Sequence, residues 1–226
     1  MEPKPLDSAG VYKLQHSPSG NPYIEIPSRS PTPIYLTKYY VTDIPTVYSV
    51  LTLPAVNLFL ISAPWPYALA DAEWWVNSQL TSSSDLNLQI LRSGSPDEDG
   101  TLLGSVSLER PGSGILETLR EKLPALEALR KGKECELGYY LHPDWRGKGI
   151  MKSGVKALLA WARAECDVQD VMVRVVDDNW ASRRVIESLG DEYFARVEGE
   201  DHEINWPENK GGGGTKKILV WKWHAS

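Results

Sequence analysis

The sequence predicts a single α/β domain of the α+β kind, in which a mixed sheet is flanked by helices. Residues 135–141 have the Tyr, Leu and Cys content of a strand, and apolar residues at three-and-four spacing predict a helix over 149–166. Segments 86–91 and 102–108 enclose the polar turn 95–100, which is typical of a hairpin. With 226 residues, of which 42% are hydrophobic and 24% charged, one domain with decorations is expected.

The N-terminal residues 1–33 carry seven prolines and few apolar side chains. We therefore expect a proline-rich extension that lies on the domain or is partly disordered, followed by the domain proper over 34–226. The alternation of Tyr23, Ile24 and Ile26 would also fit an edge strand.

The domain is expected to begin with a strand over 34–40 and two helices, one over 43–53 and one that starts at residues 70–71 and includes Leu80. The aromatic segment 65–67 falls between these helices. A lid over a substrate and packing between the helices explain such residues equally well.

After the hairpin, regularly spaced leucines predict a helical insertion over about 110–133, interrupted by Pro124. Covering a sheet edge is the favoured role for this insertion. Closing strands are predicted over 193–197 and 218–223, with a glycine-rich and mobile connection over 205–214.

A basic turn with two glycines separates the strand from its helix: Arg146, Gly147, Lys148 and Gly149. The start of a helix leaves several N–H groups unpaired at the positive end of its dipole, and glycines let the backbone approach a ligand. A phosphate or pyrophosphate is the natural ligand of such a turn. A solvated basic loop is the alternative.

This turn resembles the acyl-CoA pyrophosphate loop of the GNAT N-acetyltransferase superfamily, whose pattern is R/Q-x-x-G-x-G/A. The pattern is followed from Arg146 to Ile150, and Met151 stands where a small residue is usual. After a predicted strand over 171–176, residues 179–182 (N-W-A-S) are similar to the N-x-x-S helix that flanks the pantetheine arm in these enzymes.

The closest resemblance is to the branch of the ribosomal-protein N-terminal alanine acetyltransferases, through residues 136–139 (E-L-G-Y), the G-K-G-I-M loop and Ser182. It implies a GNAT fold with a V-shaped, mostly antiparallel sheet. It also implies acetyl-CoA as co-substrate, and direct attack by an amine in a ternary complex. The thioester carbonyl is then expected near a backbone N–H of residues 140–142. The residues expected to bind acetyl-CoA are Tyr140, Leu141, His142, Arg146, Gly147, Lys148, Gly149, Ile150, Met151, Asn179 and Ser182.

Two catalytic residues are expected from the same resemblance. Glu136 is the first candidate for the base that deprotonates the amine, with a purely structural ion pair as its alternative and Glu198, Glu200 and Asp201 as rivals. For the acid, many members use a tyrosine seven positions after the asparagine, where this chain has Ile186. Ser182 is the remaining candidate, with capping of its helix as the alternative.

Composition bears on the location of the protein, its metal binding and its partners. No run of about 18 apolar residues and no signal-peptide core are found, so we expect a cytoplasmic protein without a membrane span. Cys135 and Cys166 are expected to be buried thiols, and the four histidines show no metal-ligand spacing. The net charge of −6 argues against nucleic acid as a partner and mildly favours a cationic substrate.

We therefore expect an acetyl-CoA-dependent N-acetyltransferase, monomeric or homodimeric, that requires no metal. Its acceptor is either a small-molecule amine or a protein N-terminus. The alternative is a CoA-binding regulatory module with little or no turnover, which Met151 and Ile186 suggest because both depart from the family pattern.

Overall fold

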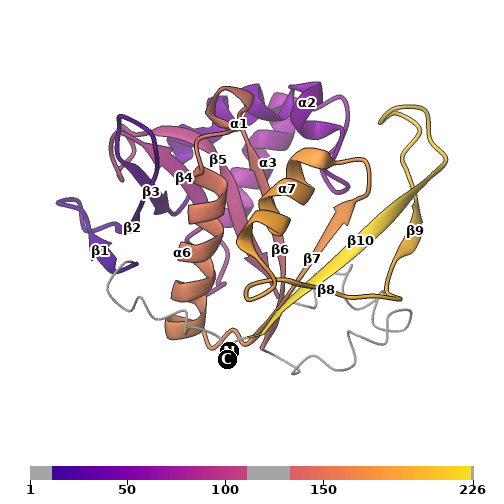
Figure 1. Cartoon of the computed structure of the whole chain (residues 1–226). Helices are drawn as coiled ribbons and strands as arrows, with labels where there is room; N and C mark the ends of the chain where they lie inside the picture. The colour runs from indigo at the N-terminus through magenta and orange to yellow at the C-terminus, as the bar shows by residue number, and fades with distance from the viewer. Residues whose placement is uncertain (1–11, 111–132, 225–226) are drawn as a thin grey trace.

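The computed structural model describes residues 12–110 and 133–224 (Figure 1). In these residues no helix is long and apolar enough to cross a membrane. The strands are β1 (Leu14–His16), β2 (Pro22–Ile26), β3 (Ile34–Thr37), β4 (Ile90–Ser93), β5 (Thr101–Glu109), β6 (Glu134–Leu141), β7 (Asp170–Val176), β8 (Ala195–Arg196), β9 (His202–Asn205) and β10 (Thr215–His224). The helices are α1 (Ile44–Leu51), α2 (Pro54–Asn57), α3 (Leu69–Leu80), α6 (Ile150–Glu165) and α7 (Trp180–Leu189), with 3₁₀ turns η1 (Val41–Asp43) and η2 (Pro143–Trp145).

All described strands belong to one open sheet in the order β1-β2-β3-β4-β5-β6-β7-β10-β8, with β9 paired to β10. Each neighbouring pair is antiparallel except β6 and β7, which run parallel. The predicted α/β class and the mostly antiparallel sheet are confirmed.

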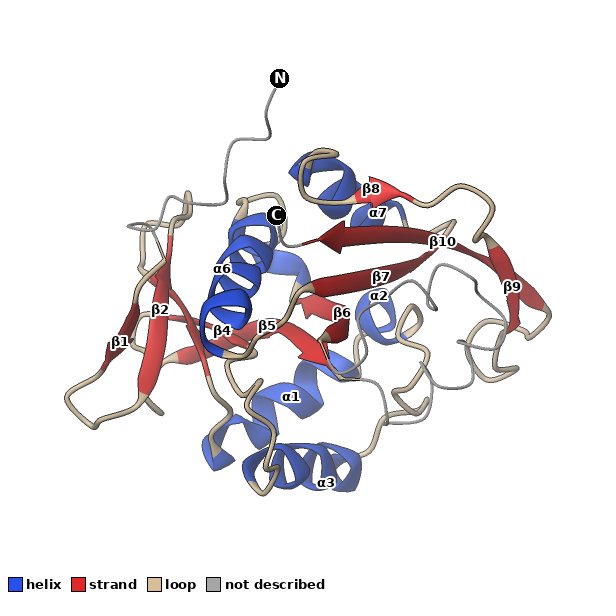
Figure 2. Cartoon of the chain, turned by 90° about the horizontal axis from the view of Figure 1, so that it is seen from below, coloured by secondary structure: helices blue, strands red, loops and turns tan. Residues whose placement is uncertain are grey.

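Helices cover both faces of the sheet. Figure 2 shows α1 and α3 on one side of the central strands and α6 on the other. Helix α6 packs closely enough on the sheet that a Cβ added at Gly154 would lie 2.9 Å from Leu91 Cδ2. A glycine is therefore needed at this point of contact. On the opposite face, Val50 of α1 and Val76 of α3 pack against Ile90 of β4.

The parallel pair β6 and β7 is short, and this creates the site. The two strands pair only from Glu134 to Glu136 on β6 and from Asp170 to Met172 on β7. Beyond that register they diverge towards their carboxyl ends (Figure 1). Backbone groups on the inner edges of the diverging ends lack the ladder partners that a sheet supplies, so a ligand can take their place. The V shape implied by the resemblance is therefore present.

Five predicted elements have wrong boundaries. The closing strand predicted over 218–223 begins already at Thr215 and ends at His224. The first strand ends at Thr37 because the Tyr40 N–H donates to Asp43 Oδ2 at 2.8 Å and starts a helical turn. The helix predicted over 43–53 runs from Ile44 to Leu51, and Pro54 opens the separate helix α2.

The other two boundary errors come from apolar residues that pack without strand pairing. The strand predicted over 86–91 begins only at Ile90 and runs to Ser93. Leu86 and Leu88 are buried in the core, which gives the strand-like alternation, although their backbone is irregular. Of the strand predicted over 193–197 only β8 is regular, since the Tyr193 and Phe194 N–H groups donate to Gly190 O.

The region before residue 34 adds two strands to the sheet. Strand β2, which contains Tyr23, Ile24 and Ile26, pairs with β3, and β1 pairs with β2. The strand that the alternation allowed is present, although β1 and not β2 forms the edge of the sheet. The helical insertion predicted over about 110–133 lies, apart from its two end residues, outside the described part of the chain.

Candidate active site

A cavity of about 630 Å³ opens where β6 and β7 diverge. Its walls include residues 137–141 of β6 and 173–176 of β7, the two segments that no longer pair. One end lies at the turn before α6, and the other, five residues back along β6, holds the carboxylates of Glu109 and Glu136. Residues 55, 56 and 59–62 line the space as well. The space is therefore elongated, with chemically different ends.

The basic turn at the first end has the conformation that its glycines predict. Gly147 and Gly149 have φ values of +75° and +77°, and Gly149 is the N-cap of α6. Neither position is crowded, so the left-handed backbone itself is what requires glycine. The N–H groups of the first helical turn after Gly149 have no helical acceptor, and Gly149, Ile150, Met151 and Lys152 line the cavity. An anion bound at this end would meet backbone donors and the positive end of the helix dipole.

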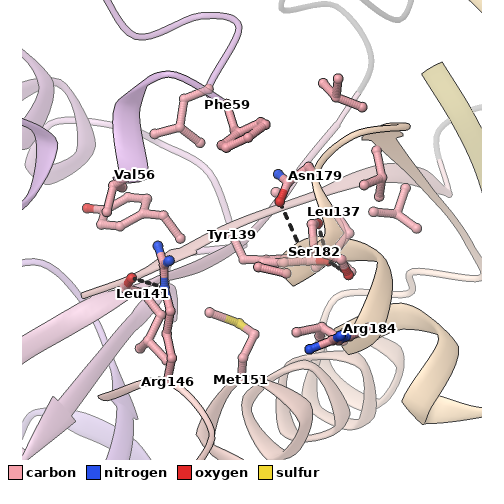
Figure 3. Close-up of a pocket in the computed structure, with 18 of the residues that line it drawn as sticks. Val56, Phe59, Leu137, Tyr139, Leu141, Arg146, Met151, Asn179, Ser182 and Arg184 are labelled. Atoms are coloured by element: carbon pink, nitrogen blue, oxygen red, sulfur yellow. Dashed lines mark hydrogen bonds between the residues drawn. The ribbon is translucent and has the colours of Figure 1, made fainter. Parts of the chain in front are cut away.

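Cationic side chains lie on both sides of this turn. Arg146 is held by hydrogen bonds to Ala55 O at 3.0 Å and Leu141 O at 3.4 Å. Figure 3 shows Arg146 and Arg184 on opposite sides of Met151. The Lys152 ammonium donates to a carbonyl at the end of α7 and links the two helices.

Arg184 and Lys152 were missed by sequence reasoning. Their position in the first two turns of the helices that follow the basic turn 146–149 and Asn179 could have indicated them. Lys148, a predicted contact, instead stacks its ammonium 4.3 Å from the Trp145 ring centroid and does not line the cavity. Met151 is buried and lines the cavity, so the larger side chain occupies space at its floor.

Asn179 and Ser182 take different roles at the start of α7. Asn179 is the N-cap, and its Oδ1 accepts the Ser182 N–H at 3.2 Å. The Ser182 hydroxyl shares a hydrogen bond of 2.7 Å with the phenol of Tyr139, which also contacts Ser182 O at 3.0 Å. Because Asn179 caps the helix, the Ser182 hydroxyl is left for another function.

Tyr139 places a phenol where the helix offers none. Ile186, which stands at the position of the usual tyrosine, is fully buried in the core. Tyr139 reaches the same region from β6 and lines the cavity beside Ser182 (Figure 3). Burial raises the pKa of Tyr139 well above its usual value, and the hydrogen bond with Ser182 only partly opposes this. The phenol therefore stays protonated at neutral pH and can donate a hydrogen bond.

The backbone of β6 offers one donor to the gap near the predicted carbonyl position. The His142 N–H donates to Leu103 O at 2.8 Å and is thus used by β5. Because N–H groups of successive strand residues point to opposite edges, the Leu141 N–H faces the side from which β7 has diverged. Within 140–142, Leu141 is therefore the residue whose N–H faces the gap. The His142 side chain accepts the Asp144 N–H and does not line the cavity.

The second end of the cavity carries acidic and apolar groups. Of the predicted bases, Glu136 lines the cavity, whereas Glu198, Glu200 and Asp201 do not. Glu136 Oε1 is 2.7 Å from Arg174 Nε, so the alternative of an ion pair is realised. Glu109 at the end of β5 also lines the cavity and was missed by sequence reasoning.

Part of the apolar lining comes from a segment that begins beside Arg146 and was not singled out in the sequence. Val56 and Phe59 lie across the cavity from β6 (Figure 3). The aromatic segment 65–67 does not line the cavity, and Tyr67 is buried in the cluster under α1 and α3. Packing between helices is thus the role of Tyr67.

Other reactive groups lie apart from this site. Cys135 is fully buried, and burial raises the pKa of its thiol to about 12, which is unsuitable for a nucleophile. Among the described residues, no three His, Cys, Asp or Glu side chains gather as metal ligands would.

Comparison with known proteins agrees with this geometry. The profile described as an acetyltransferase (GNAT) domain matches residues 34–192. No curated protein matches the sequence significantly.

Solved structures share the fold at low sequence identity. RimJ of Mycobacterium smegmatis in complex with CoA-disulfide has a TM-score of 0.61 at 11% identity, over 90% of this chain and 87% of that one. The ribosomal-protein-S5-alanine acetyltransferase of Vibrio fischeri has a TM-score of 0.58 at 15% identity, over 85% and 93%.

The acetyltransferase yncA of Salmonella typhimurium, solved with acetyl-CoA and described as putative, has a TM-score of 0.55 at 17% identity, over 87% and 95%. The family profile covers well over half of the chain, and the neighbours include the branch that the sequence resembles. The chain is an N-acetyltransferase that belongs to the GNAT family.

Proposed function

We propose that this enzyme uses acetyl-CoA and transfers the acetyl group to a primary amine by direct attack in a ternary complex. The observation that carries the proposal is the single cavity that joins an anion-binding helix start to an acidic, apolar end. The first end suits the pyrophosphate, because Gly147, Gly149 and the N–H groups at the start of α6 can bind its oxygens. Arg146 and Arg184 would balance its negative charge. Bound acetyl-CoA supplies an activated acetyl group as a thioester.

The chain's own groups supply orientation and proton transfer. The Leu141 N–H is positioned to hold the thioester oxygen, and charge that develops on that oxygen is stabilised by such a fixed donor. The hydroxyl pair of Tyr139 and Ser182 donates a hydrogen bond towards the leaving sulfur. A carboxylate at the acidic end takes the proton of the ammonium.

The acceptor is a small-molecule amine or a protein N-terminus. Carboxylates attract a cationic amine, and Val56 and Phe59 offer apolar contact to its carbon skeleton. The neighbour named as a ribosomal-protein-S5-alanine acetyltransferase supports a protein acceptor. The exposure of Glu109 at the acidic end fits either kind of acceptor. The competing proposal of a CoA-binding regulatory module rests on Met151, which fills space at the cavity floor.

A panel of acceptors assayed by free-thiol release tests this proposal. It includes alkyl and aryl amines, amino sugars, polyamines, peptides with free N-termini and the same peptides with blocked N-termini. Turnover with any free amine above the rate of thioester hydrolysis is expected. Calorimetric binding of acetyl-CoA without turnover on the whole panel would favour the regulatory module instead.

A further inference from the structure

The acidic end of the cavity holds two carboxylates that face each other across neighbouring strands. Glu109 of β5 and Glu136 of β6 are direct register partners in an antiparallel pair. Side chains at such positions project from the same face and lie close together, and like charges placed this way are destabilising. Both line the cavity, so the repulsion is located where a substrate binds.

Within residues 12–110 and 133–224, only Glu136 of these two carboxylates has a cationic partner. Arg174 of β7 forms an ion pair with Glu136, with Nε and Oε1 at 2.7 Å, and the two side chains are only 7% and 20% exposed. Arg110, the next residue after Glu109, pairs with Asp85 and donates to Cys166 O, so its charge is engaged elsewhere. Among the described residues no cation contacts Glu109.

We propose that Glu109 is the base that receives the proton of the acceptor ammonium, and that Glu136 with Arg174 positions it. This inference rests on the proposed function and deepens it. The charges of Glu109, Glu136 and Arg174 sum to one net negative charge, which a single ammonium group neutralises. Glu109 is also exposed at the cavity, so an incoming amine can reach it.

The electrostatic surroundings of Glu109 suit a base at neutral pH. Although Glu109 can be reached from the cavity, the protein atoms packed around its carboxyl group and the negative charge of Glu136 raise the pKa of Glu109 above its usual value. A carboxylate with a raised pKa accepts a proton more readily, and catalysis is most efficient when the pKa of the base approaches the working pH. Glu136, by contrast, is engaged in the ion pair with Arg174.

The balance of the step is simple. The ammonium loses a proton and the Glu109 carboxylate becomes a carboxylic acid; the free amine then forms the C–N bond as the C–S bond breaks. Glu136, the register partner of Glu109, lies three positions, or about 10 Å, from Tyr139 along β6. The proton of the ammonium therefore reaches Glu109 through water rather than directly. Glu109 afterwards releases the proton to solvent, and the hydroxyl pair of Tyr139 and Ser182 supports the thiolate.

The test compares the pH dependence of kcat/KM in the wild type, Glu109→Gln and Glu136→Gln, with an amine that the wild type acetylates. Glu109→Gln should lower kcat/KM about a hundredfold at pH 7, and the loss should shrink as the pH approaches the amine's own pKa, about 10 for an alkylamine. In Glu136→Gln, the fall of kcat/KM at low pH, which is the acid limb of the profile, should persist and move to lower pH. The reason is that Glu109 loses a neighbouring negative charge and faces an unpaired Arg174.

A structural role would not move the acid limb in this way. Glu73→Gln, on an exposed part of α3 away from the cavity, is the matched control and should leave the profile unchanged. Melting temperatures and acetyl-CoA titrations check that each variant is folded and binds its co-substrate. Loss of the acid limb in Glu136→Gln with its retention in Glu109→Gln would assign the base to Glu136, and retention in both would exclude both carboxylates. Absence of turnover in the wild type would refute the proposed function, and this inference with it.

Discussion

At the residue scale, the hydroxyl pair of Ser182 and Tyr139 provides a candidate acid in place of the tyrosine that Ile186 replaces. Sequence reasoning found Ser182 as the acid candidate only because Ile186 replaced the usual tyrosine. The partner phenol on β6 was not foreseen as a partner, because a pairing between residues 43 positions apart depends on the tertiary fold. The register of β6 against its neighbours decides which side of the strand Tyr139 faces.

The first prediction concerns this pair. Ser182→Ala should lower kcat by about five- to thirtyfold with little change in the KM for acetyl-CoA, since one hydrogen bond to the thiolate is lost. The double variant with Tyr139→Phe should lose less than the product of the two single effects, because the hydroxyls act as one unit. The melting temperature of Ser182→Ala should stay near that of the wild type, since Asn179 supplies the cap. A destabilised variant with full kcat would contradict the role in leaving-group stabilisation.

The second prediction concerns the glycine turn. Gly149→Glu should weaken acetyl-CoA binding more than about tenfold, because a side chain and a like charge enter the pyrophosphate site. Gly20→Glu is the matched control: Gly20 also has positive φ and open space around it, but it lies in the turn between β1 and β2. Calorimetric titration compares the three proteins. Equal affinity in a folded Gly149→Glu protein would place the pyrophosphate elsewhere.

At the element scale, the segments carrying the motifs were predictable and the connections between them were not. Helix α6 and strand β7 follow from local periodicity and apolar composition, which are properties of neighbouring residues. Helix α7 was expected from the resemblance of residues 179–182 to the N-x-x-S helix of the family. The buried but irregular segment around Leu86 and Leu88 shows the limit of that reasoning. Burial pattern alone does not distinguish a paired strand from a chain that merely packs.

The third prediction uses the cap of α7. Asn179→Ala should lower the free energy of unfolding by about 1 kcal/mol, since the Ser182 N–H loses its acceptor. Asn77→Ala, on the exposed face of α3, should have little effect or stabilise slightly, because alanine favours a helix interior. Urea unfolding monitored by circular dichroism measures both. Equal stabilities of the two variants would show that Asn179 does not cap α7.

At the scale of the whole molecule, the helical layer is joined to the sheet by a buried ion pair. Arg92 of β4 donates to both carboxylate oxygens of Asp43, which precedes α1, and the two side chains are 1% and 3% exposed. The sequence gives no sign of this contact, since an arginine in a strand usually faces solvent. Only the pairing of β3 with β4 brings the two residues together.

The fourth prediction tests that pair. Arg92→Met should destabilise the fold by about 3–5 kcal/mol, because the Asp43 charge would remain buried without its partner. Lys216→Met removes a more exposed pair with Asp178 and should cost less than about 1 kcal/mol. Chemical denaturation of both variants gives the comparison. A loss in Arg92→Met no larger than in Lys216→Met would show that Asp43 is solvated.

The central claim is that one cavity carries an acetyl group from acetyl-CoA to an amine, and following the acetyl group itself tests it most directly. The enzyme is incubated with acetyl-CoA labelled in the acetyl carbon and with an amine found by the acceptor panel. The label should appear in the amine in an amount equal to the free thiol released, with none retained on the protein. Gly149→Glu should lower the rate of transfer more than about tenfold at limiting acetyl-CoA. Thiol release without labelled amine, or label held by the protein, would contradict direct acetyl transfer at this site.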